Sequence, residues 1–170
     1  MLILGIDPGT ATTGYGVVKV LGKKVEALNW GLIKTENNYS YETRLLDIYR
    51  QMNNLLRDYQ PGVIAIEKLF FATNAKTAMS VGQAQGVMLY CAARNKVKVV
   101  KYAPGTIKKV VAGNGKAKKK EIQKALRKVF GAKVRSAKRK KTHFDNAADA
   151  LAVALCHFYH LRGKINNERG

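Results

Sequence analysis

Acidic residues are scarce in this chain. Its 170 residues include 11 Asp and Glu against 31 Lys and Arg, which gives a formal net charge of +20. The excess is concentrated, because the segment from Arg94 to Lys141 holds 19 of the basic residues and a single acid, Glu121. A field of this sign attracts polyanions, and the backbone of a nucleic acid is the polyanion we expect. A solubilising surface usually mixes both signs, so it explains this segment less well.

Other absences narrow the class of protein further. The two cysteines, Cys91 and Cys156, lie far apart without metal-type spacing and suggest no disulfide framework, which favours a reducing compartment. No apolar run reaches the length of a membrane span, and the opening "MLILGI" is too short for a signal peptide. No apolar helical stripe accompanies the lysines, which argues against a membrane surface as partner. We therefore expect a cytoplasmic protein that does not associate with membranes.

The order of hydrophobic patterns predicts one α/β domain with a mixed sheet flanked by helices. Strand-like runs are "LILGI", "TGYGVVKVL" and "KVEALNWGLIKT" (joined as a hairpin through Gly22-Lys23), "VIAIE" and "VKVVKY". Helical patterns cover 41–59, 75–94, 104–111, "KEIQKALRKVF" and a final helix from about Asp145 to His160. The domain is predicted to span residues 1–162, and residues 163–170 are predicted to form a flexible C-terminal tail.

Three of the acids stand at unusual positions. Asp7 ends the first predicted strand, Glu67 ends the fourth, and Asp149 lies between two alanines in the final helix. Ligand crevices of open α/β sheets form at strand ends, and an unpaired carboxylate there is costly unless a cation or hydrogen bonds hold it. Together the three could bind Mg²⁺, and two such ions could activate a water molecule against a phosphodiester. The pattern favours a nuclease.

Each acid also has a simpler explanation. Asp7 could be a turn residue before Pro8-Gly9. Glu67 could be a surface acid paired with Lys68. Asp149 could interact with the positive end of the helix dipole. The combination of all three in a strongly basic chain favours the metal site over these separate explanations.

Four separated motifs resemble the RuvC family of Holliday-junction resolvases, in order and from Leu2 to about His160: "GIDPGTATTGYGVV", "IEKLFFATNAKTAMSVGQAQGV", "TIKKVVAGNGKAKKKEI" and "NAADALAVALCH". The resemblance implies an RNase H-like fold with a five-stranded sheet. It implies a homodimer that cuts a four-way DNA junction by paired symmetric nicks. It also implies Mg²⁺ or Mn²⁺, with two ions per site, and a RuvA–RuvB branch-migration complex as a further partner.

The resemblance assigns roles to individual positions. Asp7, Glu67, Asn146 and Asp149 occupy the places of the catalytic metal ligands. Positions 146 and 149 share one helical face. DNA-binding roles fall on Phe70, whose ring would stack on bases, and on Lys76, Lys108 and Lys119. Core packing is the alternative for Phe70 and Phe71, and each lysine could be a plain surface residue. The helix that begins near Lys76 resembles the family's dimer contact.

Asn146 departs from the family pattern, in which an acid or a histidine stands at this position. An amide oxygen can touch a metal but carries no negative charge, so this chain is expected to bind DNA and cut poorly. In one explanation Asp145 or His143 compensates, although Asp145 is better placed as a helix N-cap and His143 as a surface or capping residue. In the other, which we favour, an acid has been replaced by its isosteric amide.

The sequence leaves other functions open. The stretch "DPGTATTGYG" also resembles the phosphate-binding loop of actin-like and sugar-kinase ATPases, but those proteins duplicate the domain and this chain has one copy. A non-catalytic nucleic-acid-binding module, or a related RNase H-like nuclease with another substrate, fits the same charge pattern.

Overall fold

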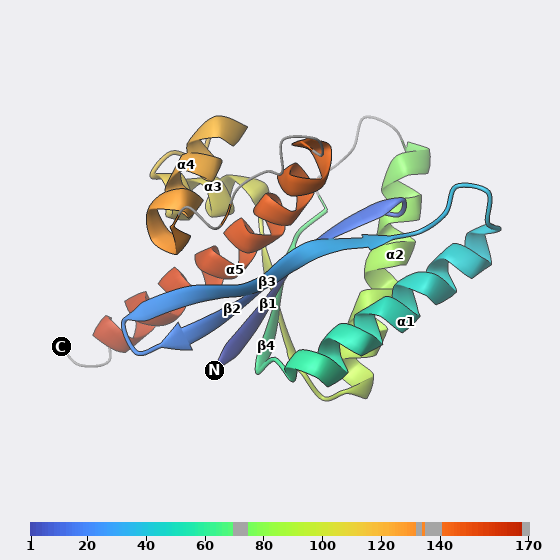
Figure 1. The fold of residues 1–170 in the computed structure, drawn as a ribbon, viewed down its shortest axis with the longest axis horizontal. Helices are drawn as coiled ribbons and strands as arrows, with labels where there is room; N and C mark the ends of the chain where they lie inside the picture. Colours follow the sequence, from blue (N-terminus) through green and yellow to red (C-terminus); the bar gives the residue numbers. More distant parts are fainter. Residues whose placement is uncertain (70–74, 132–133, 135–140, 168–170) are drawn as a thin grey trace.

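The fold is built on a five-stranded sheet whose strands lie in the order β3-β2-β1-β4-β5 (Figure 1). The computed structural model describes residues 1–69, 75–131, 134 and 141–167, and of 141–144 and 164–167 only the helical backbone. The strands are β1 (Leu2–Asp7), β2 (Thr12–Leu21), β3 (Lys24–Lys34), β4 (Val63–Glu67) and β5 (Lys98–Tyr102). The helices are α1 (Tyr41–Tyr59), α2 (Ala75–Arg94), α3 (Pro104–Ala112), α4 (Lys119–Phe130) and α5 (Lys141–Asn167).

The sheet is mixed, as predicted. β1, β2 and β3 form an antiparallel meander, whereas β4 pairs parallel to both β1 and β5. The β2–β3 hairpin turns at Gly22, whose φ of 58° lies in the left-handed region that glycine adopts without a steric penalty. The carboxyl ends of the parallel strands β1, β4 and β5 therefore lie at the same end of the sheet, where ligand crevices of α/β folds form.

Both faces of the sheet are buried, because successive residues of a strand point to opposite sides. Even-numbered residues of the central strands, such as Leu4, Ile6, Ile64 and Ile66, pack with α1 and α2. Odd-numbered residues join a second core with α3, α4 and α5: Ile3, Val63, Ala65. Figure 1 shows the same division, with α1 and α2 on one side of the sheet and α5 on the other.

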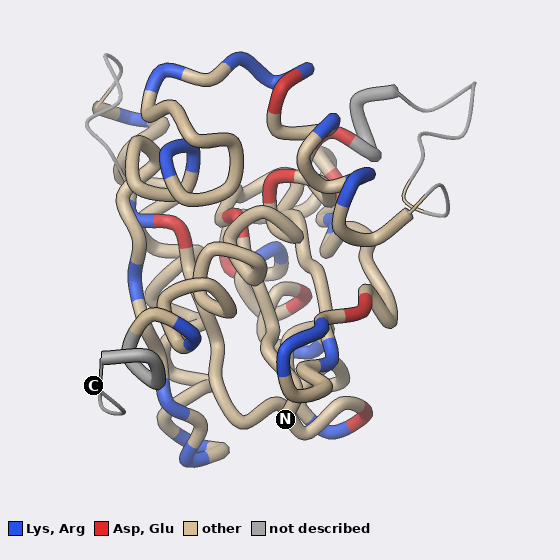
Figure 2. The backbone as a smooth tube through the Cα atoms, turned by 90° about the vertical axis from the view of Figure 1, so that its left-hand side faces the viewer, with Lys and Arg blue, Asp and Glu red and all other residues tan. Residues whose placement is uncertain are grey.

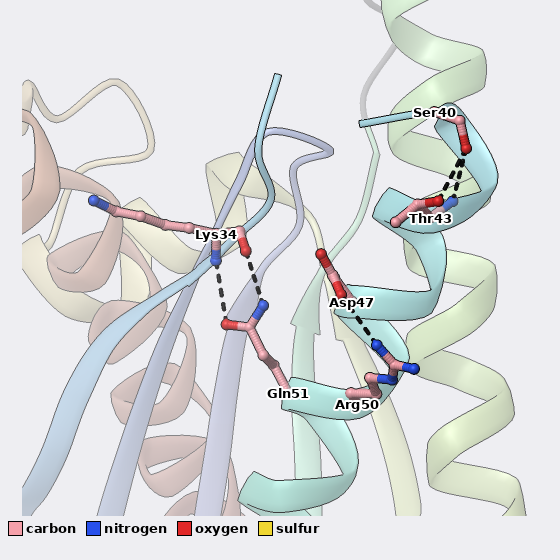
Figure 3. A network of polar contacts seen from close by, with 6 residues as sticks. All are labelled: Lys34, Ser40, Thr43, Asp47, Arg50 and Gln51. Carbon is pink, nitrogen blue, oxygen red and sulfur yellow. Dashed lines mark hydrogen bonds and ion pairs between the residues drawn. The ribbon is translucent and has the colours of Figure 1, made fainter. Parts of the chain in front are cut away.

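Helix α1 is held to the edge strand by a pair of hydrogen bonds (Figure 3). The Gln51 amide donates to the Lys34 carbonyl at 2.8 Å and accepts from the Lys34 backbone N–H at 3.4 Å. The helix begins after Ser40, whose side chain accepts a hydrogen bond from the Thr43 backbone N–H. It ends at Gln60, which adopts a left-handed φ of 44° directly before Pro61. The predicted bounds of this helix are confirmed.

The predicted bounds of the last helix are wrong at both ends. Helix α5 begins at Lys141 and ends at Asn167, instead of running from Asp145 to His160. Neither proline nor glycine stands between Lys141 and Asp145, and lysine is a good helix former, so the helix already begins at Lys141. Asp145 consequently lies inside α5, and its predicted role as N-cap is wrong. The tail over residues 163–170 stays a prediction.

None of the helices in the described part of the chain is both long and apolar enough to cross a membrane.

Candidate active site

Asp7 and Glu67 lie side by side because two parallel strands end together. Ile6 of β1 pairs with Ile66 of β4, and each acid is the next residue of its strand. Asp7 lies two residues after Gly5, and Glu67 lies two residues after Ala65, so each acid shares a face of the sheet with that residue. Ala65 packs in the core against α5. Both carboxylates therefore belong to the face of the sheet that α5 covers.

Glycines in β1 and β2 allow α5 to approach the sheet closely. Gly14 is the cross-strand partner of Asp7, and a Cβ atom at Gly14 would stand 2.0 Å from the Asn146 carbonyl oxygen. A Cβ at Gly5 would stand 2.1 Å from the Ala150 carbonyl oxygen. Real Cβ atoms do not come this close to backbone atoms, so only glycine fits at either position. This contact places residues 146 and 149 of α5 beside the end of β1.

We expect Gly14→Ala to lower stability and junction cleavage together. The added methyl group must push the α5 backbone away, and overpacking of this kind costs roughly 1–3 kcal/mol. The same displacement moves Asn146 and Asp149 away from Asp7. Denaturant unfolding measures the first effect, and a cleavage assay under conditions where the variant is fully folded measures the second.

Gly163→Ala is the matched control for this substitution. It lies on α5 as well, and among the described residues no atom stands within 4 Å of an added Cβ. Alanine in place of glycine in an exposed helix should raise stability, by up to ~1 kcal/mol, and leave cleavage unchanged. If Gly14→Ala behaved like Gly163→Ala, the close approach of α5 would not be what positions the site.

The carboxylates destabilise one another as anions. The pKa of Asp7 is raised to about 7, chiefly by burial and then by the Glu67 and Asp149 carboxylates, while Lys119 opposes the rise. Burial raises the pKa of Glu67 to about 6, with a contribution from Asp149 and opposition from Lys108. The pKa of Asp149 is also raised, first by burial, while Lys119 pulls it down. The three acids, which come from separate elements, thus lie near enough to interact electrostatically.

Two lysines stand at the same site. A pocket of about 250 Å³ is lined by Glu67 and Asp149 together with Lys108 of α3 and Lys119 of α4. The Lys119 ammonium lies 3.3 Å from Asp149 Oδ2 and 3.5 Å from Asp145 Oδ2. Figure 2 shows several acidic backbone segments near the middle of the view and many basic segments around them. The arrangement combines a negative centre with cations that can receive a phosphate.

Asp145 is the site residue that sequence reasoning placed wrongly. Its Oδ1 accepts a hydrogen bond of 2.8 Å from the Gln123 amide, and its Oδ2 pairs with Lys119. Asp145 also raises the pKa of Asp149 through its charge. The sequence predicts that the helix begins at residue 145, and a capping role then accounts for this acid. Its neighbour in the constellation, Gln123 of α4, carried no signal in the sequence.

Gln85 is a second polar residue that the sequence did not single out. It is buried in α2, and its amide donates a hydrogen bond of 3.2 Å to the backbone carbonyl of Glu67. It therefore holds the end of β4, where the Glu67 side chain begins. The signal in the sequence that could have identified Gln85 is a glutamine at an apolar position of the helical pattern, because a buried amide needs a hydrogen-bond partner.

The donor set suits a hard divalent cation. Carboxylate oxygens are the ligands that Mg²⁺ prefers, and a cation among Asp7, Glu67 and Asp149 would relieve the repulsion that raises their pKa values. Within the ranges that the structure describes, no three His, Cys, Asp or Glu side chains form a group that could hold a metal ion as they stand. The Lys119 ammonium, paired with Asp145 and Asp149, contributes the positive charge on that side of the site.

The remaining predicted residues fall elsewhere. Lys76 is exposed on α2 and lines a different pocket, near the β1–β2 turn. Phe70 and Phe71 lie outside the described residues, as does the side chain of His143.

Comparisons with known proteins agree over nearly the whole chain. The family described as "Crossover junction endodeoxyribonuclease RuvC" matches residues 3–157. A protein of that name from Natranaerobius thermophilus is 41% identical over 167 residues, which cover 97% of this chain and 100% of that protein. Another, from Alkaliphilus metalliredigens, is 42% identical over 157 residues and 92% of each chain.

Solved structures show the same fold. The Thermus thermophilus RuvC structure superposes with a TM-score of 0.84 at 34% identity, covering 96% of this chain and 97% of that one. T. thermophilus RuvC in complex with Holliday junction substrate superposes with a TM-score of 0.86 at 33% identity, covering 96% of both chains. The predicted RNase H-like fold is confirmed.

Proposed function

Because this chain belongs to the RuvC family of crossover junction endodeoxyribonucleases, it is a nuclease that resolves Holliday junctions, and we propose that it does so at the carboxylate site between β1, β4 and α5. The observation that supports this placement is the meeting of Asp7, Glu67 and Asp149, from three distant parts of the chain, in a basic protein. Isolated surface acids would not raise one another's pKa values.

Members of this family depend on a metal ion, and we propose Mg²⁺, or Mn²⁺ in its place, with two ions per site. Asp7, Glu67 and Asp149 would hold them, with Asn146 as a neutral fourth ligand. Bound there, the ions supply an activated water molecule and stabilise the leaving oxygen of the phosphodiester. The hard oxygen donors and their unfavourable burial as anions support this choice of ion.

The two pocket lysines have a separate task in this proposal. Lys108 and Lys119 line the pocket beside Glu67 and Asp149, so a phosphate entering it would meet two ammonium groups. Lys119 pairs with Asp145 and Asp149 before DNA arrives, which keeps it pointed into the site. Its ammonium can then turn to the phosphate and stabilise the negative charge that builds up in the transition state.

The homodimer is proposed to form through α1 and α2. A hollow on their outer side is lined by one polar residue, Gln83, and otherwise by apolar and small residues: Leu45, Leu46, Tyr49, Gly86, Val87 and Tyr90. Leu46 is 43% exposed and Tyr90 is 57% exposed, and in the described part of the chain nothing stands within 4 Å of a Cβ built at Gly86. A two-fold axis through this surface would relate two sites and so explain paired cuts.

Tyr90→Asp should therefore convert a dimer to a monomer without unfolding it. A buried charge in an apolar interface has no partner, so association weakens while the exposed position tolerates the change. Sedimentation or light scattering measures the oligomeric state, and Tyr90→Phe serves as the control. A Tyr90→Asp variant that stayed dimeric would exclude this surface as the interface.

Junction cleavage with and without Mg²⁺ tests the function itself. The expected result is slow paired nicking of a four-way junction, preferred over a linear duplex of equal length in competition, because charge attraction alone does not distinguish the two. Cleavage that ignored the branch would instead point to an RNase H-like nuclease with another substrate.

A further inference from the structure

A second hollow lies at the same end of the sheet as the carboxylate site but on the opposite face. It has a volume of about 490 Å³ and lies between the β1–β2 turn and the beginnings of α1 and α2. We call it the turn pocket and define it by six of its lining residues: Thr10, Asn37, Tyr41, Arg44, Lys76 and Ser80.

The lining of the turn pocket suits a phosphate. Arg44 and Lys76 bring positive charge, and no acid occurs among the described residues that line it. Hydroxyl and amide groups of the other four add uncharged hydrogen-bonding positions. Guanidinium and ammonium groups with such neighbours are the usual protein contacts to DNA phosphates.

Arg44 is fixed in place by the turn that follows Asp7. Its Nε donates a hydrogen bond of 3.0 Å to Thr35 Oγ1, and that hydroxyl donates one of 2.9 Å to the Thr10 carbonyl. The backbone N–H of Thr35 donates to the Ala11 carbonyl at 3.2 Å. Across the described residues, the two terminal nitrogens of Arg44 make no hydrogen bond or ion pair. The bond to Thr35 thus orients the guanidinium, whose planar fork matches the geometry of a phosphate.

Thr10 adds an independent sign of a ligand. Its hydroxyl oxygen is buried, and within the described part of the chain it has no hydrogen-bond partner. Leaving a buried hydroxyl unpaired costs free energy, and a phosphate oxygen in the turn pocket could accept its hydrogen after a rotation about χ1.

The turn pocket is close enough to the carboxylates to contact the same DNA strand. Thr10 follows Asp7 by three residues, so their Cα atoms lie at most about 11 Å apart. One strand of B-DNA rises ~3.4 Å per nucleotide, so this distance corresponds to about three nucleotides. We propose that the turn pocket binds a backbone phosphate of the strand being cut, within about three nucleotides of the scissile bond. This inference rests on the proposed function, since it assumes that Asp7 marks the point of cleavage.

The test compares junction binding by Arg44→Gln and Arg50→Gln at several salt concentrations, without divalent cation so that nothing is cut. Arg50 is the matched control, because it lies on the same helix, pairs with Asp47 at 3.8 Å and does not line the turn pocket (Figure 3). Loss of one phosphate contact should weaken binding roughly tenfold and reduce the slope of log K against log[salt] by about 0.9. Arg50→Gln should keep both the affinity and the slope.

Two further measurements separate a lost contact from a damaged fold. Arg44→Lys keeps the charge but loses the bond to Thr35, so it should keep the salt slope and bind with intermediate affinity. Junctions that carry one neutral methylphosphonate identify the phosphate. The phosphate that the turn pocket binds is the one whose replacement weakens junction binding by the unaltered protein but not by Arg44→Gln.

Equal affinities and slopes for Arg44→Gln, Arg50→Gln and the unaltered chain would overturn the inference and leave the nuclease function intact. Failure of the unaltered chain to bind the junction would instead count against the proposed function.

Discussion

Replacement of Asn146 by aspartate is expected to raise Mg²⁺-dependent cleavage of a four-way junction roughly a hundredfold, which corresponds to ~3 kcal/mol of transition-state stabilisation. Residue 146 lies on α5, one turn before Asp149 and over Gly14, the strand partner of Asp7. An acid there adds a fourth negative charge to the ligand set, and a second divalent ion gains most from it. Single-turnover cleavage across a range of Mg²⁺ concentrations measures both rate and metal affinity.

Asp145→Asn, made in both backgrounds, distinguishes the two explanations of Asn146. If Asp145 compensates for the missing acid, Asp145→Asn should reduce cleavage strongly in the otherwise unaltered chain. In the Asn146→Asp variant, the same substitution should reduce cleavage much less. Its contact with Lys119 at 3.5 Å places it near enough to Asp149 for such a role. Equal cleavage by the unaltered chain and Asn146→Asp would contradict the idea that the amide limits catalysis.

Asp7→Asn is expected to remove detectable cleavage and, in the absence of metal, to stabilise the fold at neutral pH. The pKa of Asp7 rises from an ordinary 3.8 to about 7 on folding, mainly through burial. Between roughly pH 4 and pH 7 the folded state therefore binds more protons than the unfolded state, and stability falls as pH rises through this window. An asparagine has no charge to bury, so the variant should lose this part of the pH dependence.

Thermal unfolding at about pH 5 and pH 8, with and without Mg²⁺, provides the measurement. The unaltered chain should be stabilised by Mg²⁺ at pH 8 by mass action, and Asp7→Asn should respond much less. Asp47→Asn is the control, because Asp47 lies on α1, away from the carboxylate site. An Asp7→Asn variant that lost stability at pH 8 without metal would show that its carboxylate is held by partners rather than strained by burial.

Local patterns were enough to predict most of the fold. The hairpin at Gly22, the span of α1 and the strands ending at Asp7 and Glu67 follow from period-two alternation, helical spacing and turn residues, which act over a few positions. The predicted bounds of α5 are wrong because both ends of this helix are polar and show no apolar helical pattern. The stability of the helix comes from its buried middle, Ala147 to Phe158. Nucleic-acid cleavage by a basic chain with acids at strand ends likewise follows from the sequence alone.

By itself, then, the sequence determined which elements form, where the positive charge lies and which acids stand at strand ends, because each depends on neighbouring residues. Only the tertiary structure decided three contacts. Asp145 pairs with Lys119, and Gly14 lies against the Asn146 carbonyl. Arg44 is hydrogen-bonded to Thr35, which in turn bonds to the turn after Asp7. These contacts join residues that are distant along the chain, and their geometry depends on how closely α1 and α5 pack on the two faces of the sheet. Packing distances of that kind come from the whole core and leave no local pattern in the sequence.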